Sequence, residues 1–73
     1  MNKHETESVV IRLDDFLKHE GIVGTGGEAK VRIQSGEVRV NGDVEVRRRK
    51  QLRVGDVVEV LGHTLTVSGY SSI

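Results

Sequence analysis

The side chains best suited to binding chemistry are four consecutive cations, Arg47, Arg48, Arg49 and Lys50. A guanidinium group is planar and can donate two parallel hydrogen bonds to a phosphate, so this run is suited to a polyanion. If the segment is extended, alternate side chains point to opposite sides and at least two should face one ligand. The competing interpretation is a solvated turn that keeps a sheet edge soluble.

The charge is unevenly distributed, although its total is zero. Residues 1–29 contain three Lys and Arg against six Asp and Glu, whereas residues 30–53 contain eight against three. A local concentration of positive charge, and not the total, decides whether a polyanion binds. The middle of the chain is therefore the predicted binding region.

A second candidate phosphate contact is the pair Gly26-Gly27, at the expected start of a helix. Glycines there let a phosphate approach backbone N–H groups and the positive end of the helix dipole, with Lys30 one turn further on. The segment lacks the Gly-Lys-Ser/Thr of a nucleotide-binding loop and the full dinucleotide motif. A flexible turn between two helices is the alternative.

Residues for catalysis or metal binding are poorly placed. The chain has no Cys, and its three His fall on an expected tail, a helix end and a turn, without metal-ligand spacing, at His4, His19 and His63. Asp14 and Asp15 are adjacent, so their carboxylates should point in different directions, and we interpret them as helix-start carboxylates. We expect no enzyme activity, no metal and no cofactor.

Two helices are expected in the first half of the chain. The first begins near Asp14 and ends at Gly21, and its buried face carries Leu13, Phe16 and Leu17. The second runs from about residue 26 to residue 35, and we predict for it a Thr25/Glu28 capping box, a core face of Ala29 and Ile33, and an end at Gly36. Val31 has no place on that core face.

The second half is typical of short strands. Apolar residues alternate over 38–40, 44–46, 58–60 and 65–67, and segment 52–54 leads into a Gly55-Asp56 turn. Asn41-Gly42 is a strong hairpin signal, and Gly62-His63 suits a two-residue turn. A strand over 8–11, two helices and then four or five strands predict an α+β fold, with the helices on one face of an antiparallel sheet.

A chain of 73 residues has room for one core. We expect one domain over residues 8–68, flanked by mobile tails over 1–7 and 69–73. No segment approaches the roughly 18 apolar residues of a membrane span, so we expect a soluble, cytoplasmic monomer without a membrane partner.

The scarcity of aromatic residues bears on the kind of nucleic acid. Phe16, expected in the core, and Tyr70 are the two aromatic residues. Proteins that bind single strands usually stack bases on aromatic side chains. The sequence therefore favours structured RNA, recognised by shape, phosphates and 2′-hydroxyls.

Three ordered motifs resemble the S4 RNA-binding domain. They are Arg12-Leu13-Asp14-x-x-Leu17, Glu28-Ala29-x-x-x-Ile33-x-x-Gly36-x-Val38-x-Val40-Asn41-Gly42, and Val54-Gly55-Asp56-Val57-Val58-x-Val60. The resemblance covers about residues 9–61, and Gly26-Gly27-Glu28-Ala29-Lys30 is similar to the small stand-alone members.

The resemblance implies two helices packed on a small, bent antiparallel sheet of four to five strands. It also implies a non-catalytic module for structured RNA, ribosomal or transfer RNA, with ribosomal or RNA-processing proteins as further partners. By position it assigns RNA contacts to Arg12, Thr25, Gly26, Gly27, Lys30, Arg39, Asn41, Arg47, Arg48, Arg49 and Lys50. Arg32 stands where many members have an apolar residue, and it either extends the basic face or lies along the core edge.

A second function remains open, because many members place a Ser-Arg pair where this chain has Gly26-Gly27. The zero net charge and the acidic first third also suit a protein-interaction adaptor that keeps the fold without strong RNA binding. Geometry discriminates the two functions: in an adaptor, Glu37, Asp43 and Glu45 would interleave with the cations and neutralise them.

Overall fold

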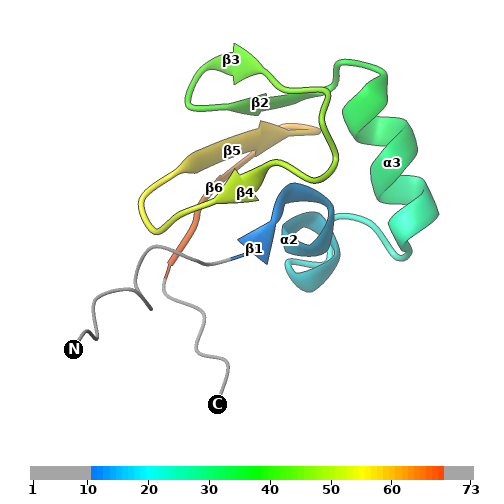
Figure 1. The fold of residues 1–73 in the computed structure, drawn as a ribbon, viewed down its shortest axis with the longest axis horizontal. Coiled ribbons are helices and arrows are strands. Elements are labelled where there is room, and N and C mark those ends of the chain that lie inside the picture. The colour runs from blue at the N-terminus through cyan, green and yellow to red at the C-terminus, as the bar shows by residue number, and fades with distance from the viewer. Residues whose placement is uncertain (1–10, 69–73) are drawn as a thin grey trace.

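The computed structural model of the chain describes residues 11–68, which form two helices and two antiparallel sheets (Figure 1). The predicted α+β class is confirmed. In chain order the elements are β1 (Ile11–Arg12), α2 (Leu13–His19), α3 (Gly26–Gln34), β2 (Val38–Val40), β3 (Asp43–Val44), β4 (Gln51–Leu52), β5 (Val57–Val60) and β6 (His63–Thr66).

The larger sheet has the strand order β3-β2-β5-β6, and β1 pairs separately with β4. In that smaller pair Ile11 lies opposite Leu52 and Arg12 lies opposite Gln51. Because β1 leads directly into α2, this pairing fixes the start of α2 against the segment that follows the basic run (Figure 1).

One apolar core joins both helices to both sheets. The expected helical faces are confirmed, since Leu13, Phe16 and Leu17 of α2 and Ala29 and Ile33 of α3 are buried. Alternation along β2 and β5 adds four valines to them, because successive side chains of a strand point to opposite faces. The complete buried apolar set is Leu13, Phe16, Leu17, Val23, Ala29, Ile33, Val38, Val40, Leu52, Val58, Val60 and Val67.

Helix α3 begins and ends nearly as its sequence predicts. The Thr25 hydroxyl accepts a hydrogen bond from the Glu28 N–H at 3.1 Å. The Glu28 carboxylate accepts from the N–H of Gly24 at 2.9 Å, one residue earlier than in the standard capping box. The helix ends at Ser35, and Gly36 follows with φ +88°, the left-handed conformation that favours glycine. Val31 is exposed.

The first hairpin is confirmed at its turn but differs along its second strand. Asn41 and Gly42 have φ values of +52° and +90°, as a two-residue primed turn requires. The strand predicted over residues 44–46 is wrong, because β3 spans only Asp43–Val44. Val44 pairs with the outward-facing Arg39, so Val44 and Val46 remain 50% and 49% exposed and Glu45 turns inward.

The second hairpin turns one residue earlier than predicted. Val60 pairs with His63, so the two turn residues are Leu61 and Gly62, and His63 is the first residue of β6. Leu61 has φ +51°, which is unfavourable for a residue with a branched side chain, and Gly62 has φ +81°. The Gly62-His63 turn is therefore wrong by one position.

Several predictions fall outside the described residues: both tails, His4, Tyr70 and residues 8–10 of the first strand. Within residues 11–68, neither helix has the length and apolar character needed to cross a membrane.

We predict that Leu61→Asn raises the free energy of unfolding by about 0.5–1 kcal/mol, because Asn tolerates the left-handed conformation and Leu does not. Urea denaturation of the two proteins measures the difference. Leu61→Ala is the matched control, since it removes the exposed side chain but keeps the backbone penalty. Equal stabilities of the Asn and Ala variants would contradict the prediction.

Candidate nucleic-acid interface

The basic run forms a turn and not an extended segment. The Lys50 N–H donates to the Arg47 carbonyl at 3.1 Å, which closes a four-residue turn between β3 and β4. The expected alternation of side chains therefore does not apply. The four cationic side chains nevertheless line one groove.

The backbone of this turn caps helix α2. The first N–H groups of a helix have no partner inside the helix, and the N-cap residue Arg12 supplies no side-chain cap. The Leu13 N–H donates to the Lys50 carbonyl at 2.8 Å, and the Asp14 N–H donates to the Arg48 carbonyl at 3.0 Å. The basic turn and the start of α2 are therefore one structural unit.

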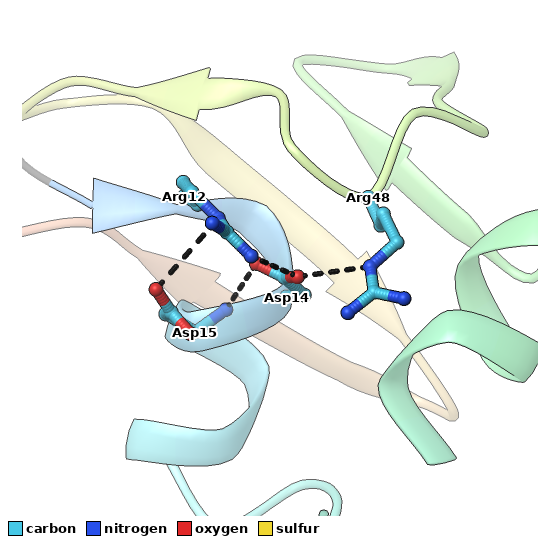
Figure 2. A network of polar contacts seen from close by, with 4 residues as sticks. All are labelled: Arg12, Asp14, Asp15 and Arg48. Carbon is cyan, nitrogen blue, oxygen red and sulfur yellow. Dashed lines mark hydrogen bonds and ion pairs between the residues drawn. The ribbon is translucent and has the colours of Figure 1, made fainter. Parts of the chain in front are cut away.

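Asp14 ties this unit together through its side chain (Figure 2). The carboxylate is only 3% exposed and accepts two hydrogen bonds from Arg12, Nε at 3.1 Å and Nη2 at 2.7 Å. It also accepts from Arg48 Nε at 3.1 Å and from the Asp15 N–H at 2.8 Å. Two arginines thus converge on one buried carboxylate, and one of them, Arg48, lies 34 residues from Asp14 in the sequence.

The charges in this network explain why a buried carboxylate is tolerated. The hydrogen bonds from Arg12 lower the pKa of Asp14, and those from Arg48 and the Asp15 N–H add to this, against the opposing effect of burial. Asp14 is therefore ionised at neutral pH. Asp15 is 54% exposed at its side chain, as a helix-start carboxylate was expected to be, whereas the sequence did not reveal the burial of Asp14.

The cationic side chains of the turn line a groove of about 720 Å³ beside the last residue of α3. Its lining contains five cations and no carboxylate. The lining residues are Gln34, Val46, Arg47, Arg48, Arg49, Lys50, Gln51 and Arg53. We call this the basic groove.

The five cations of the basic groove are not equally available. Arg47 forms a two-pronged ion pair with Glu45, at 2.8 and 3.1 Å, and Arg48 is held by Asp14. Among residues 11–68, no carboxylate lies within ion-pair distance of the other three, which are Arg49, Lys50 and Arg53.

A neighbouring hollow shares four lining residues with the basic groove, at positions 47, 50, 51 and 53, but adds the carboxylates of Asp43, Glu45 and Asp56. Asn41 also lines it. The Asn41 side chain accepts from the Val57 N–H at 2.9 Å and donates to Asp56 at 3.1 Å, so it fastens the hairpin turn to β5. Negative charge is therefore concentrated at the hairpin end of the basic groove.

The other predicted contacts lie apart from the basic groove. Thr25, Gly26 and Gly27 are at the opposite end of α3, where the Thr25 hydroxyl and the Glu28 carboxylate accept hydrogen bonds from two of the local N–H groups, and Lys30 lies in the middle of the helix. Arg32 pairs with Glu37 at 3.0 Å and with Glu28 at 3.9 Å.

Arg39 lies in a separate hollow lined also by Glu37 and Glu59. Arg12 faces Asp14. The structure thus gathers Arg47–Lys50 in one groove and distributes the other eight predicted contacts elsewhere. It adds Arg53, which the sequence analysis missed because this residue follows the basic run after two uncharged positions.

We predict that Asp14→Asn lowers the free energy of unfolding by about 2 kcal/mol, because it removes the shared anion from two arginines and leaves a weaker acceptor buried. Urea denaturation provides the measurement. The adjacent Asp15→Asn variant is the control, and we expect its effect to stay within about 0.5 kcal/mol. Equal losses from the two variants would count against the network.

We also predict an acid-side transition at Glu45. Hydrogen bonds from Arg47 lower the pKa of Glu45 from its usual 4.5 to about 2. Because this pKa is lower in the folded state, the pair stabilises the fold fully above pH 4.5, and its contribution is lost as the pH falls towards 2. A carbon-detected NMR titration of the Glu45 carboxyl measures the midpoint. Arg47→Gln should return it towards 4.5, and a wild-type midpoint already there would refute the pairing.

Comparisons with known proteins agree with this architecture. A family model described as the S4 domain matches residues 4–68. The "Putative RNA-binding protein YbcJ" of Escherichia coli (strain K12) is 40% identical over 57 residues, which cover 78% of this chain and 81% of that protein. The "Probable ribosome maturation protein RlbA" of Bacillus subtilis (strain 168) is 39% identical over 61 residues, 84% of this chain and 86% of that protein.

Two solved structures are similar in fold. The solution structure of YbcJ from E. coli, described as revealing an alfaL motif involved in RNA-binding, has a TM-score of 0.65 and 36% identity, covering 94% of this chain and 82% of that one. The trimeric Heat Shock Protein 15 of Vibrio cholerae has a TM-score of 0.74 at 22% identity and supports the fold alone. The similarity covers 84% of this chain but only 65% of that one. By its family match and these relatives, the chain belongs to the S4 domain family.

Proposed function

We propose that this protein is a non-catalytic module that binds structured RNA through the basic groove. The observation that carries the proposal is that five cationic side chains line one groove whose wall contains no carboxylate. Three of them, Arg49, Lys50 and Arg53, form no ion pair with any described residue and are available to phosphates, although Lys50 is close enough to Glu45 for its charge to help lower the pKa of that carboxylate. The turn that bears most of the groove is held by its contacts to α2.

Structured RNA is the target that fits best. Among residues 11–68 the single aromatic residue, Phe16, is fully buried, so no base-stacking platform stands beside the basic groove. Cations carried on a turn whose backbone is fixed instead suit the regular phosphates of a folded RNA. The relatives RlbA, named for ribosome maturation, and YbcJ, named for RNA binding, support ribosomal RNA ahead of transfer RNA. We therefore expect the protein to act in the cytoplasm, with ribosomal or RNA-processing proteins as further partners.

This geometry divides the predicted contact residues into direct phosphate contacts, residues that hold the groove in shape, and outer contacts. Arg49 and Lys50 are proposed as direct phosphate contacts, whereas Arg12 and Arg48 act mainly by holding the groove in shape through Asp14. Lys30, with the Thr25–Gly27 segment, and Arg39 with Asn41 would form outer contacts of a larger RNA.

The adaptor function has one observation in its favour, which is the neutralisation of several cations. Glu45 holds Arg47, and Glu37 holds Arg32, so two of the three carboxylates singled out in the sequence do interleave with cations. The basic groove itself contains none of them. We therefore place RNA binding first.

We predict that the double variant Arg49→Gln/Lys50→Gln weakens binding to a structured RNA hairpin by about tenfold or more at about 50 mM salt, because it removes two phosphate contacts. With three contacts in the wild type, the slope of log affinity against log salt should be about −2 to −3, and the variant should lose about 2 of this. Fluorescence anisotropy at several salt concentrations measures both quantities.

The matched control is Lys3→Gln/Lys18→Gln, which removes two positive charges that belong to none of the proposed RNA contacts. Equal losses from the two double variants would mean that net charge, and not the groove, governs binding. Failure of the wild type to bind any of several structured hairpins would overturn the proposal and favour the adaptor.

A further inference from the structure

We propose that the basic groove distinguishes RNA from DNA through Gln34 and Gln51, beside the phosphate contact that the proposed function already gives to Arg53. This inference rests on the proposed function and specifies which part of the nucleic acid the groove reads. The two Gln side chains and Arg53 line the same groove as the cationic turn.

Arg53 combines a free side chain with a fixed backbone. Its N–H donates to the Asp56 carboxylate at 2.8 Å, and its carbonyl accepts from the Asp56 N–H at 3.0 Å. These two bonds hold the turn that follows β4 while the guanidinium group remains exposed. Arg53 also lines the adjoining hollow, as do Arg47, Lys50 and Gln51, so it is one of four residues that stand between the groove and the carboxylates of Asp43, Glu45 and Asp56.

The carboxylates of the adjoining hollow make the charge around the groove uneven. A phosphate is attracted to the cations of the groove and repelled by the three carboxylates of the adjoining hollow. Arg48 and Arg49 line the basic groove alone, whereas Arg47, Lys50 and Arg53 border both hollows, so an RNA backbone should keep to the side of the groove away from the carboxylates.

The two Gln residues are neutral groups in a cationic site. Ile33 fills the core from α3, so the next residue, Gln34, faces outward at the end of the helix. Leu52 fills the core from β4, so Gln51 likewise faces outward. Neither amide has a hydrogen-bond partner among the described residues, and both are exposed.

An amide side chain both donates and accepts hydrogen bonds, and so does a ribose 2′-hydroxyl. Arginine and lysine only donate, which suits phosphate oxygens but does not separate RNA from DNA. Two unpartnered amides in the same groove as the phosphate-binding cations therefore suit a ribose-phosphate backbone, with the cations on the phosphates and the amides on 2′-hydroxyls.

The test uses the full chain and two probes of one hairpin sequence, the RNA and its all-deoxy counterpart. We expect the wild type to bind the RNA about tenfold more tightly. Gln34→Ala/Gln51→Ala should weaken RNA binding roughly three- to tenfold, leave DNA binding unchanged, and leave the salt slope unchanged, because no charge is lost. Arg53→Gln should weaken binding to both probes and reduce the salt slope by about 1.

The outcomes separate this inference from the function on which it rests. Suppose that Arg49→Gln/Lys50→Gln abolishes binding, while Gln34→Ala/Gln51→Ala either weakens RNA and DNA binding equally or weakens neither. The groove then binds nucleic acid, but the two amides do not distinguish ribose from deoxyribose. The control Lys18→Gln should change neither the affinity nor the salt slope. If Arg53→Gln also changes neither, Arg53 is not a phosphate contact. If no probe binds the wild type, the proposed function itself fails. Far-UV circular dichroism of each variant confirms that the fold is intact.

Discussion

The carboxylate of Asp14 is the interaction on which the rest of the interface depends. It is buried at the start of α2 and carries hydrogen bonds from Arg12, on β1, and from Arg48, in the basic turn. The Asp14 N–H returns a hydrogen bond to the Arg48 carbonyl, so the two residues are linked twice. A cluster of positive charge repels itself, and one shared anion lets the turn bend back onto the helix with its remaining cations facing the solvent.

The elements whose ends and turns depend on nearby residues could be predicted from short sequence motifs. Helix α3 follows from the Thr25 and Glu28 cap, the spacing of Ala29 and Ile33, and a glycine at its end. The Asn41-Gly42 turn follows from the positive φ values that only a few residue types adopt easily. These features lie within the short segments 25–36 and 41–42, so the sequence of each segment is enough to find them without its partner in the fold.

The features that the sequence did not reveal arise from long-range pairing. Nothing near Asp14 indicates that Arg48 will reach it, and a pair of adjacent carboxylates is normally solvated at a helix start. The inward turn of Glu45 and the exposure of Val44 result from the register set by Arg39 on β2. Arg53 follows the run of four cations as a single charged residue, and only the folded chain brings it into the same groove as that run.

The capping of α2 by the basic turn also constrains the order in which the chain can fold. Helix α2 has seven residues, too few to be stable alone, and its first N–H groups find their acceptors at residues 48 and 50. During synthesis, α2 therefore cannot be completed until the chain has grown beyond residue 50. The helix that comes first along the sequence thus depends for its start on a segment that is synthesised more than thirty residues later.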